Sequence, residues 1–188
     1  TSLSRFNKEK LKKIIPLLSF IVLLSYHTFA QNWTTLVTEN ECTHRHENSL
    51  AAVKGHIYLL GGRRVKPVEE YNTKTKSWTK KIVTPIEMHH FQAITYKKEI
   101  WVLGAFTGPY PHEKPIEHIW IYNPKKDEWR KGPDIPEDRL RGSAGAFEHN
   151  NKIYLICGIQ DGHWDGHVAW FDVYDPKTNV WQQLPDAP

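Results

Sequence analysis

A Tyr and a Trp recur together at a nearly constant interval along the chain. The unit Tyr-x6-Trp occurs three times, in residues 71–78, 122–129 and 174–181, and its tryptophans are separated by 51 and 52 residues. Neither a helical bundle nor a doubly wound sheet requires such a period, whereas a chain that stacks copies of one supersecondary unit does. The sequence therefore predicts a repeat architecture before its composition is considered.

Each copy of the repeat contains four runs of strand length separated by turn residues. The second run is the clearest, an apolar segment in residues 57–62, 100–105 and 153–158. A continuous apolar run of this length is typical of a strand buried on both faces. The third run ends at the repeated Tyr, a polar turn led by Asn or Asp follows, and the fourth run begins at the Trp. Four antiparallel strands in a period of about 50 residues predict one propeller blade.

The glycines after the second run, together with the downstream Tyr and Trp, resemble the kelch repeat. The Gly pair at 61–62 becomes Gly-Ala at 104–105 and Cys-Gly at 157–158. The resemblance covers residues 42–188 and implies an all-β, kelch-type β-propeller, in which glycines allow a sharp turn and the aromatic rings pack between blades. We expect three four-stranded blades, at about 44–82, 88–132 and 140–184.

Residues 33–36 lie in the register of a fourth strand that lacks the preceding three. Trp33 lies 24 residues before Ile57, as Trp129 lies 24 residues before Ile153. The resemblance to kelch proteins implies that one terminus donates a strand that closes the ring. We therefore expect a closing strand at about 32–37, and residues 31–188 to be the N-terminal part of a six-bladed ring. The expected binding partner of this N-terminal part would be the missing C-terminal blades of the same chain.

The first 30 residues have the layout of a secretory signal peptide. Four lysines between Lys8 and Lys13 precede an apolar run at 14–24, and a short polar segment ends at Ala30. The apolar run is shorter than the roughly 20 residues that a membrane span needs. We expect cleavage after Ala30, an exported protein in the periplasm or outside the cell, and no stable membrane anchor.

The net charge of the chain comes from this leader. The chain has 25 basic and 21 acidic residues. Five of the basic residues and one of the acidic residues lie in residues 1–30, which leaves 20 of each class in the remainder. A formally neutral chain lacks the basic excess with which proteins neutralise phosphate backbones. No nucleic-acid partner is therefore expected.

The connections that follow the second and fourth strands fall on one face of a propeller, and they vary in length. Binding and catalytic residues are often found on long loops that a rigid scaffold holds in place. Arginine donates in a bidentate manner to carboxylate or phosphate, and aromatic rings offer flat apolar faces to sugars. We expect a binding module for a carbohydrate or an anionic small molecule such as a sugar acid. The candidate ligand-binding residues are Arg45, His46, Arg63, Arg64, His89, His90, Arg141, His163, Trp164 and His167.

Metal and catalytic functions have weaker sequence support. The segment 161–167 is rich in Asp and His, but its spacing matches neither an EF-hand nor a zinc signature, so we predict no metal site and no cofactor. The chain contains no GxSxG, HExxH, P-loop or GxGxxG motif, and the catalytic residues of any enzyme stay unknown. Galactose oxidase and the exported N-acetylneuraminate epimerases are kelch-type enzymes. A sugar epimerase, mutarotase or oxidase is therefore the alternative by analogy of fold, and a protein-interaction platform is the third hypothesis.

Overall fold

The structure, a computed structural model, describes residues 33–188. The expected signal peptide lies outside the described residues, as does the first residue of the expected closing strand. The chain divides into two compact units, residues 1–36 and 37–188. In the first unit, residues 33–36 are exposed and form no strand, so the closing strand stays a prediction. Within the described part, no helix has the length and apolar character needed to cross a membrane.

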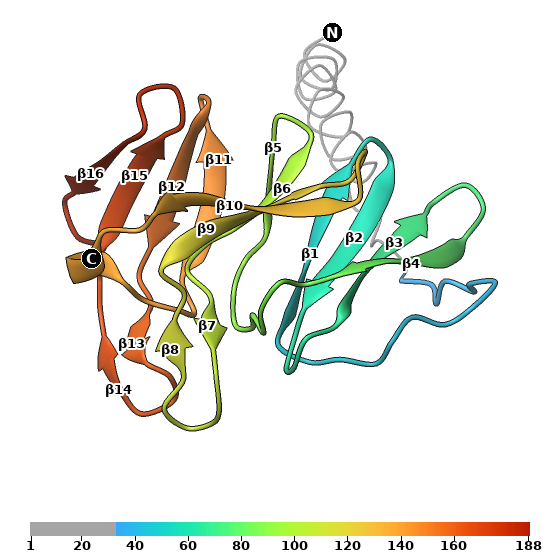
Figure 1. Cartoon of the computed structure of the whole chain (residues 1–188), viewed down its shortest axis with the longest axis horizontal. Coiled ribbons are helices and arrows are strands. Elements are labelled where there is room, and N and C mark those ends of the chain that lie inside the picture. The colour runs from blue at the N-terminus through green and yellow to red at the C-terminus, as the bar shows by residue number, and fades with distance from the viewer. Residues whose placement is uncertain (1–32) are drawn as a thin grey trace, which may run out of the picture. The chain divides into compact units, whose positions relative to one another are not determined.

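The second unit contains three four-stranded antiparallel sheets, which we call blades 1, 2 and 3 (Figure 1). Blade 1 is formed by β1 (Asn48–Val53), β2 (His56–Gly61), β3 (Pro67–Asn72) and β4 (Ser77–Val83). Blade 2 is formed by β5 (Ile94–Tyr96), β6 (Glu99–Val102), β9 (His118–Asn123) and β10 (Glu128–Asp134). Blade 3 is formed by β11 (Gly145–His149), β12 (Lys152–Ile156), β15 (Phe171–Asp175) and β16 (Val180–Leu184). In each sheet the four strands pair in chain order, which is the arrangement of a propeller blade.

Two short ribbons extend the loops between the second and third strands of blades 2 and 3. They are β7 (Phe106–Thr107) with β8 (Lys114–Pro115), and β13 (Ile159–Asp161) with β14 (Asp165–His167). A 3-10 helix, η1 (Glu137–Arg139), lies in the connection between blades 2 and 3. Both ribbons lie at the lower edge of Figure 1, opposite the turns that join β1 to β2 and β11 to β12. We call these two sides the long-loop face and the turn face.

Each Tyr–Trp unit forms a cross-strand pair between the third and fourth strands of its blade. The ring centroids lie 4.9 Å apart in Tyr71–Trp78, 5.2 Å in Tyr122–Trp129 and 5.1 Å in Tyr174–Trp181. Trp129 also packs against a buried cluster that belongs mainly to blade 1. Trp181 packs against the core of blade 2, and its Nε1 donates to Asp134 O at 3.0 Å. These two indoles therefore join neighbouring blades.

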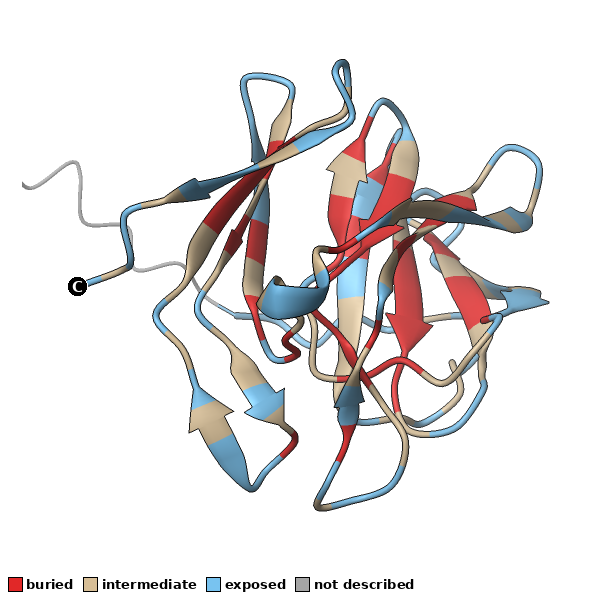
Figure 2. Cartoon of the chain, turned by 60° about the vertical axis from the view of Figure 1, so that its left-hand side comes forward, coloured by how far each residue is buried: buried red, intermediate tan, exposed pale blue. Residues whose placement is uncertain are grey.

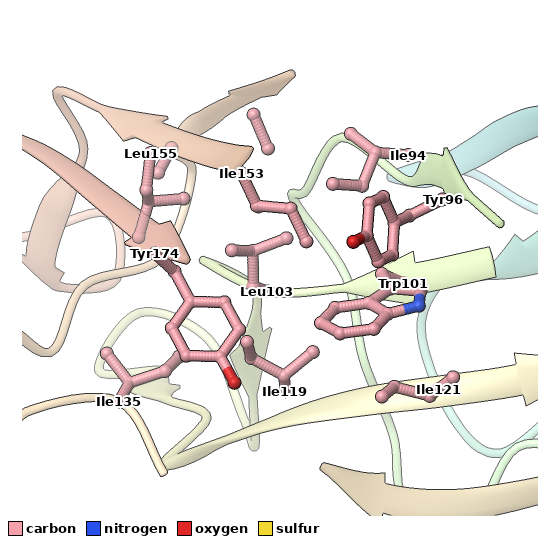
Figure 3. Close-up of a cluster of buried hydrophobic side chains, with 12 residues drawn as sticks. Ile94, Tyr96, Trp101, Leu103, Ile119, Ile121, Ile135, Ile153, Leu155 and Tyr174 are labelled. Carbon is pink, nitrogen blue, oxygen red and sulfur yellow. The ribbon is translucent and has the colours of Figure 1, made fainter. Parts of the chain in front are cut away.

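The largest buried cluster lies between blades 2 and 3 (Figure 3). Leu103 and Ile119 of blade 2 meet Ile153 and Leu155 of blade 3, and all four side chains are fully buried. Complete burial of one such side chain stabilises the fold by about 1.5–3 kcal/mol. The outer strands β4, β10 and β16 hold only intermediate and exposed residues (Figure 2). The apolar surface of each blade is thus buried mainly against the next blade.

The glycine pair of blade 1 lets the end of β2 approach the following connection closely. Gly61 and Gly62 have φ values of +67° and +101°, and a Cβ on Gly61 would lie 2.4 Å from Met88 O. Gly62 N donates to that same oxygen at 2.9 Å. In blade 3, Cys157 takes the first place of the pair with φ 54°. The sharp turn therefore survives where the glycine pair is incomplete.

Candidate functional site

Backbone hydrogen bonds on the long-loop face link the three blades. Glu47, His90 and Ser143 hold equivalent places in the connections that lead into each blade, with φ values of 59°, 51° and 51°. His90 N donates to Glu47 O at 3.0 Å, and Ser143 N donates to His90 O at 3.0 Å. This ladder brings residues that are more than 40 positions apart in the sequence side by side.

One carboxylate, that of Glu113, joins loops from all three blades. Glu113 lies between β7 and β8 of blade 2, and its side chain is fully buried. The Nη2 of Arg63, in the loop after β2 of blade 1, donates to this carboxylate. His163, at the tip of the blade 3 ribbon, contacts it through Nδ1 at 3.1 Å and backbone N at 3.2 Å. Such partners are required because an unpaired buried charge costs several kcal/mol.

The surroundings of Glu113 hold it in the ionised form. Burial alone would raise the pKa of its carboxyl group, but the hydrogen bonds from Arg63, from its own backbone N–H and from His163 outweigh that effect. The result is a pKa lowered to about 2. Glu113 is therefore a fixed anion that orients Arg63 and His163 and does not itself exchange protons near neutral pH.

Two adjacent imidazoles, those of His89 and His90, lie next to this anion. His89 is fully buried and His90 has a 20% exposed side chain, and their Nδ1 atoms are 2.8 Å apart. Burial lowers the pKa of both rings, and the positive charge of Arg63 lowers them further. The ring of His163 lies 4.8 Å from that of His90. Neutral imidazoles of this kind can accept a proton or bind a metal ion.

A hollow of about 740 Å³ lies beside the cluster on the long-loop face. Glu47 and Arg63 line it together with the cationic side chains of Arg64 and Lys66. The ring of Tyr110, which is 70% exposed, completes one side. Among the described residues, no ion pair joins the side chain of Arg64 or Lys66 to a carboxylate, although Glu87 also lines the hollow and accepts a hydrogen bond from Arg64 N at 2.8 Å. The hollow therefore offers unpaired positive charge next to an aromatic face.

A second hollow, of about 540 Å³, lies on the turn face between blades 1 and 2. Two carboxylates line it: Glu70 pairs with His56 and with Lys81 at 2.7 Å, and Glu99 pairs with Arg130 at 2.7 Å. Burial, followed by the charge of Glu70, raises the pKa of Tyr58 to about 12, so that this phenol stays protonated. We place the candidate site on the long-loop face because only that hollow adjoins the cluster of Glu113 and the histidines.

The structure gathers four of the ten predicted residues around Glu113 and Glu47. They are Arg63, His89, His90 and His163. His46 and Arg64 line the adjoining hollow. Trp164 and His167 are exposed on or beside the blade 3 ribbon, where the indole lies 5.2 Å from the ring of His112. These last two residues are not part of the buried cluster.

The structure buries the side chains of the remaining two predicted residues, Arg45 and Arg141, in ion pairs, and Arg45 also lines the hollow. The side chain of Arg45 is 2% exposed and pairs with Glu69, and that of Arg141 is fully buried and pairs with Asp172 at 2.7 Å. Both guanidinium groups also donate to backbone carbonyls of their own blade. The donors of both arginines are therefore used inside the fold, and their role as ligand contacts stays a prediction.

Blade 2 has apolar residues at the positions of this ion pair. Met88 stands two residues before His90, as Arg45 stands two before Glu47, and Trp120 takes the place of the acid. Met88 is fully buried in an apolar cluster against which Trp120 packs. Replacing a buried ion pair by packed apolar side chains is often neutral in free energy. The chain therefore fills one structural position in two ways.

Sequence reasoning missed the two acids of the cluster, Glu47 and Glu113. The candidate ligand-binding residues are all cationic, imidazole or aromatic side chains, so these two acids are not among them. The available signal was the presence of single carboxylates within loops otherwise rich in Arg and His, because buried arginines require anionic partners.

Comparisons with known proteins agree with this architecture. The family model of the kelch motif matches residues 140–188. Kelch-like protein terF of Aspergillus terreus (strain NIH 2624 / FGSC A1156) is 30% identical over 179 residues, which cover 83% of this chain and 38% of that protein. Kelch repeat and BTB domain-containing protein 8 of Danio rerio is 31% identical over 142 residues, or 71% of this chain and 21% of that protein.

A solved structure, that of YjhT, has a similar fold. It aligns with a TM-score of 0.68 and 16% sequence identity, over 80% of this chain and 54% of that chain. Three sheets of four antiparallel strands, packed in succession with their loops on a common face, define a β-propeller. The chain belongs to the kelch-repeat family, and it spans well under half of the length of the curated relatives named above.

Proposed function

We propose that this protein is an exported kelch-propeller binding module that holds a carbohydrate acid or a similar anionic small molecule on its long-loop face. The observation that carries the proposal is the pair of cationic side chains, Arg64 and Lys66, beside Tyr110 in a hollow of about 740 Å³. Small-molecule sites are concave and combine apolar walls with a few placed polar groups. Export is supported by the layout of residues 1–30 alone.

The chemistry of the hollow suits a sugar that carries a carboxylate. Arg64 offers a planar fork of N–H donors to a carboxylate, and Lys66 adds a positive charge. Tyr110 presents an exposed ring on which the apolar face of a sugar can lie. Arg63 is less available because Glu47 and Glu113 already pair with it. Arg64 and Lys66, which form no ion pair within residues 33–188, are therefore the expected ligand contacts.

Calorimetric titration of the purified protein tests this proposal. The titrants are galacturonate and N-acetylneuraminate, with galactose as the neutral sugar. We expect the acids to bind and the neutral sugar to bind at least tenfold more weakly. The variant Arg64→Gln/Lys66→Gln should lose that preference, whereas the control Lys74→Gln/Lys177→Gln removes the same charge from turn-face loops and should keep it. Equal binding by both double variants, or no heat from any titrant, would overturn the proposal.

A second candidate function, a sugar-active enzyme, is favoured by His90. Its imidazole is partly exposed and has a lowered pKa, and it lies between Glu47 and His163. A neutral imidazole of this kind is a suitable general base. Proton NMR can follow exchange of the anomers of the bound sugar acid. If the protein is an enzyme, it should speed the exchange of anomers, and His90→Asn should slow this exchange while sugar binding is kept. An exchange rate that the parent protein leaves unchanged would contradict the enzyme hypothesis.

A further inference from the structure

Three ligand atoms converge where the connections of blades 1 and 2 meet. Glu47 Oε2 lies 3.4 Å from His90 Nδ1 and 3.8 Å from His89 Nδ1, and the two nitrogens are 2.8 Å apart. A triangle with these sides has a centre about 2.0 Å from each corner, which is the distance of zinc from imidazole nitrogen and carboxylate oxygen. The three atoms therefore surround a space of the size of a transition-metal ion.

The Nε2 atom of His89 has two neighbours that require opposite tautomers of the ring. Arg63 Nη1, which can only donate, lies at 3.3 Å, and Gly108 O, which can only accept, lies at 3.4 Å. In the tautomer that donates to Gly108 O, Nδ1 carries a lone pair that faces His90 Nδ1, so that a cation can bind between the two rings. Metal-bound histidines commonly donate their other N–H to a backbone carbonyl in this way.

The backbone holds these ligands in place. His89 and Phe106 exchange two backbone hydrogen bonds of 2.9 Å each, and His90 N donates to Glu47 O. All three ligand residues are thus attached to neighbouring strands or to the ladder between blades. Ligands fixed before binding lose little freedom when the ion arrives, which favours affinity.

The charges around the triangle leave room for a divalent cation. Glu47, Glu113 and the nearby Glu87 are three acids. Among the described residues, Arg63 is the one Arg or Lys side chain in an ion pair with any of them, and the cations Arg64 and Lys66 line the same hollow as Glu47 without such a pair. Glu47 Oε2 is buried and forms an ion pair with Arg63 Nε. A carboxylate oxygen has a second lone pair that can bind an ion, and Arg63 would then orient the carboxylate from behind.

We propose that Glu47, His89 and His90 form a binding site for one divalent transition-metal ion of the zinc class. Two imidazoles and one carboxylate suit zinc and iron(II) and do not suit magnesium or calcium, which prefer oxygen ligands alone. Three protein ligands leave a coordination position open, and Glu47 also lines the hollow of the long-loop face. The metal site does not rest on the proposed sugar binding, but an ion bound to His90 Nδ1 would occupy the lone pair that the second candidate function requires.

Cobalt and zinc titrations of the chelator-treated protein test the site. We expect one equivalent of Co²⁺ to bind with visible absorption bands, Zn²⁺ to displace it, and Mg²⁺ and Ca²⁺ to leave the spectrum unchanged. His90→Asn, which suits the positive φ of that position, should weaken binding at least tenfold. His112→Asn changes an exposed histidine outside the triangle and should bind as the parent protein does.

A second variant keeps the test informative if His90→Asn does not fold. Glu47→Gln retains the shape of the ligand and should also weaken Co²⁺ binding at least tenfold, with circular dichroism to verify the fold. Absence of stoichiometric Co²⁺ uptake by the parent protein would overturn the proposal, as would unchanged affinity in both variants. Neither result affects the sugar titrations, because the metal titrations contain no sugar.

Discussion

Replacement of Glu113 by glutamine tests the idea that one buried anion joins the loops of three blades. The folded-state pKa of about 2 lies below the ordinary value of 4.5. Because the shift is downward, the native state is favoured above pH 4.5, and this stabilisation is lost as the pH falls from 4.5 to 2. At 1.36 kcal/mol for each pH unit, the carboxylate contributes about 3 kcal/mol near pH 7.

The assay is urea unfolding of the parent protein and of Glu113→Gln at several pH values from 2 to 7. We expect the variant to be about 3 kcal/mol less stable at pH 7 and nearly equal to the parent near pH 2. The control Glu117→Gln changes an acid that is 74% exposed and should stay within about 0.5 kcal/mol throughout. A difference for Glu113→Gln that is absent at pH 7, or that does not change with pH, would refute the reasoning.

Three further predictions follow from particular contacts. In thermal unfolding, Gly162→Ala should destabilise the protein by about 2 kcal/mol or more, because the added Cβ would lie 1.9 Å from Glu113 Oε2. The control Gly55→Ala also places a Cβ at a position of positive φ, but in open space, and should cost only about 1 kcal/mol. Arg45→Met should cost about 3–5 kcal/mol in urea unfolding because it leaves Glu69 buried and unpaired, and Arg45→Met/Glu69→Leu should recover most of that loss. Mass spectrometry of the protein recovered from the culture medium or periplasm should find Gln31 at its N-terminus; an intact leader would contradict export with cleavage.

The repeat of Tyr and Trp made the blades predictable from sequence. The two residues face each other across the third and fourth strands, so their spacing of seven positions follows from a short turn between those strands. The apolar second strand was visible for the same reason, since a strand buried on both faces has a continuous run of apolar residues. Residues that pair within one blade lie close together in the sequence, so their spacing is visible as a short repeated pattern.

The contacts of the site were not predictable in the same way. Glu113 meets Arg63 and His163 across 50 residues in each direction, and only the stacking of blades brings these loops together. The sequence predicts Arg45 and Arg141 as ligand contacts because arginine donates in a bidentate manner to anions, but it does not reveal their buried acidic partners. Their acidic partners stand two residues before the repeated Tyr, and comparison of the three copies within the chain would have revealed the pairing.

The central claim is that the long-loop face is where this protein binds its ligand. Hydrogen–deuterium exchange, measured with and without a sugar acid, tests it most directly. We predict slower exchange in residues 62–66 and 107–113, which hold the cationic side chains and Tyr110, with little change on the turn face. Protection confined to residues 54–56, 97–99 and 123–125, which line the other hollow, would contradict the account.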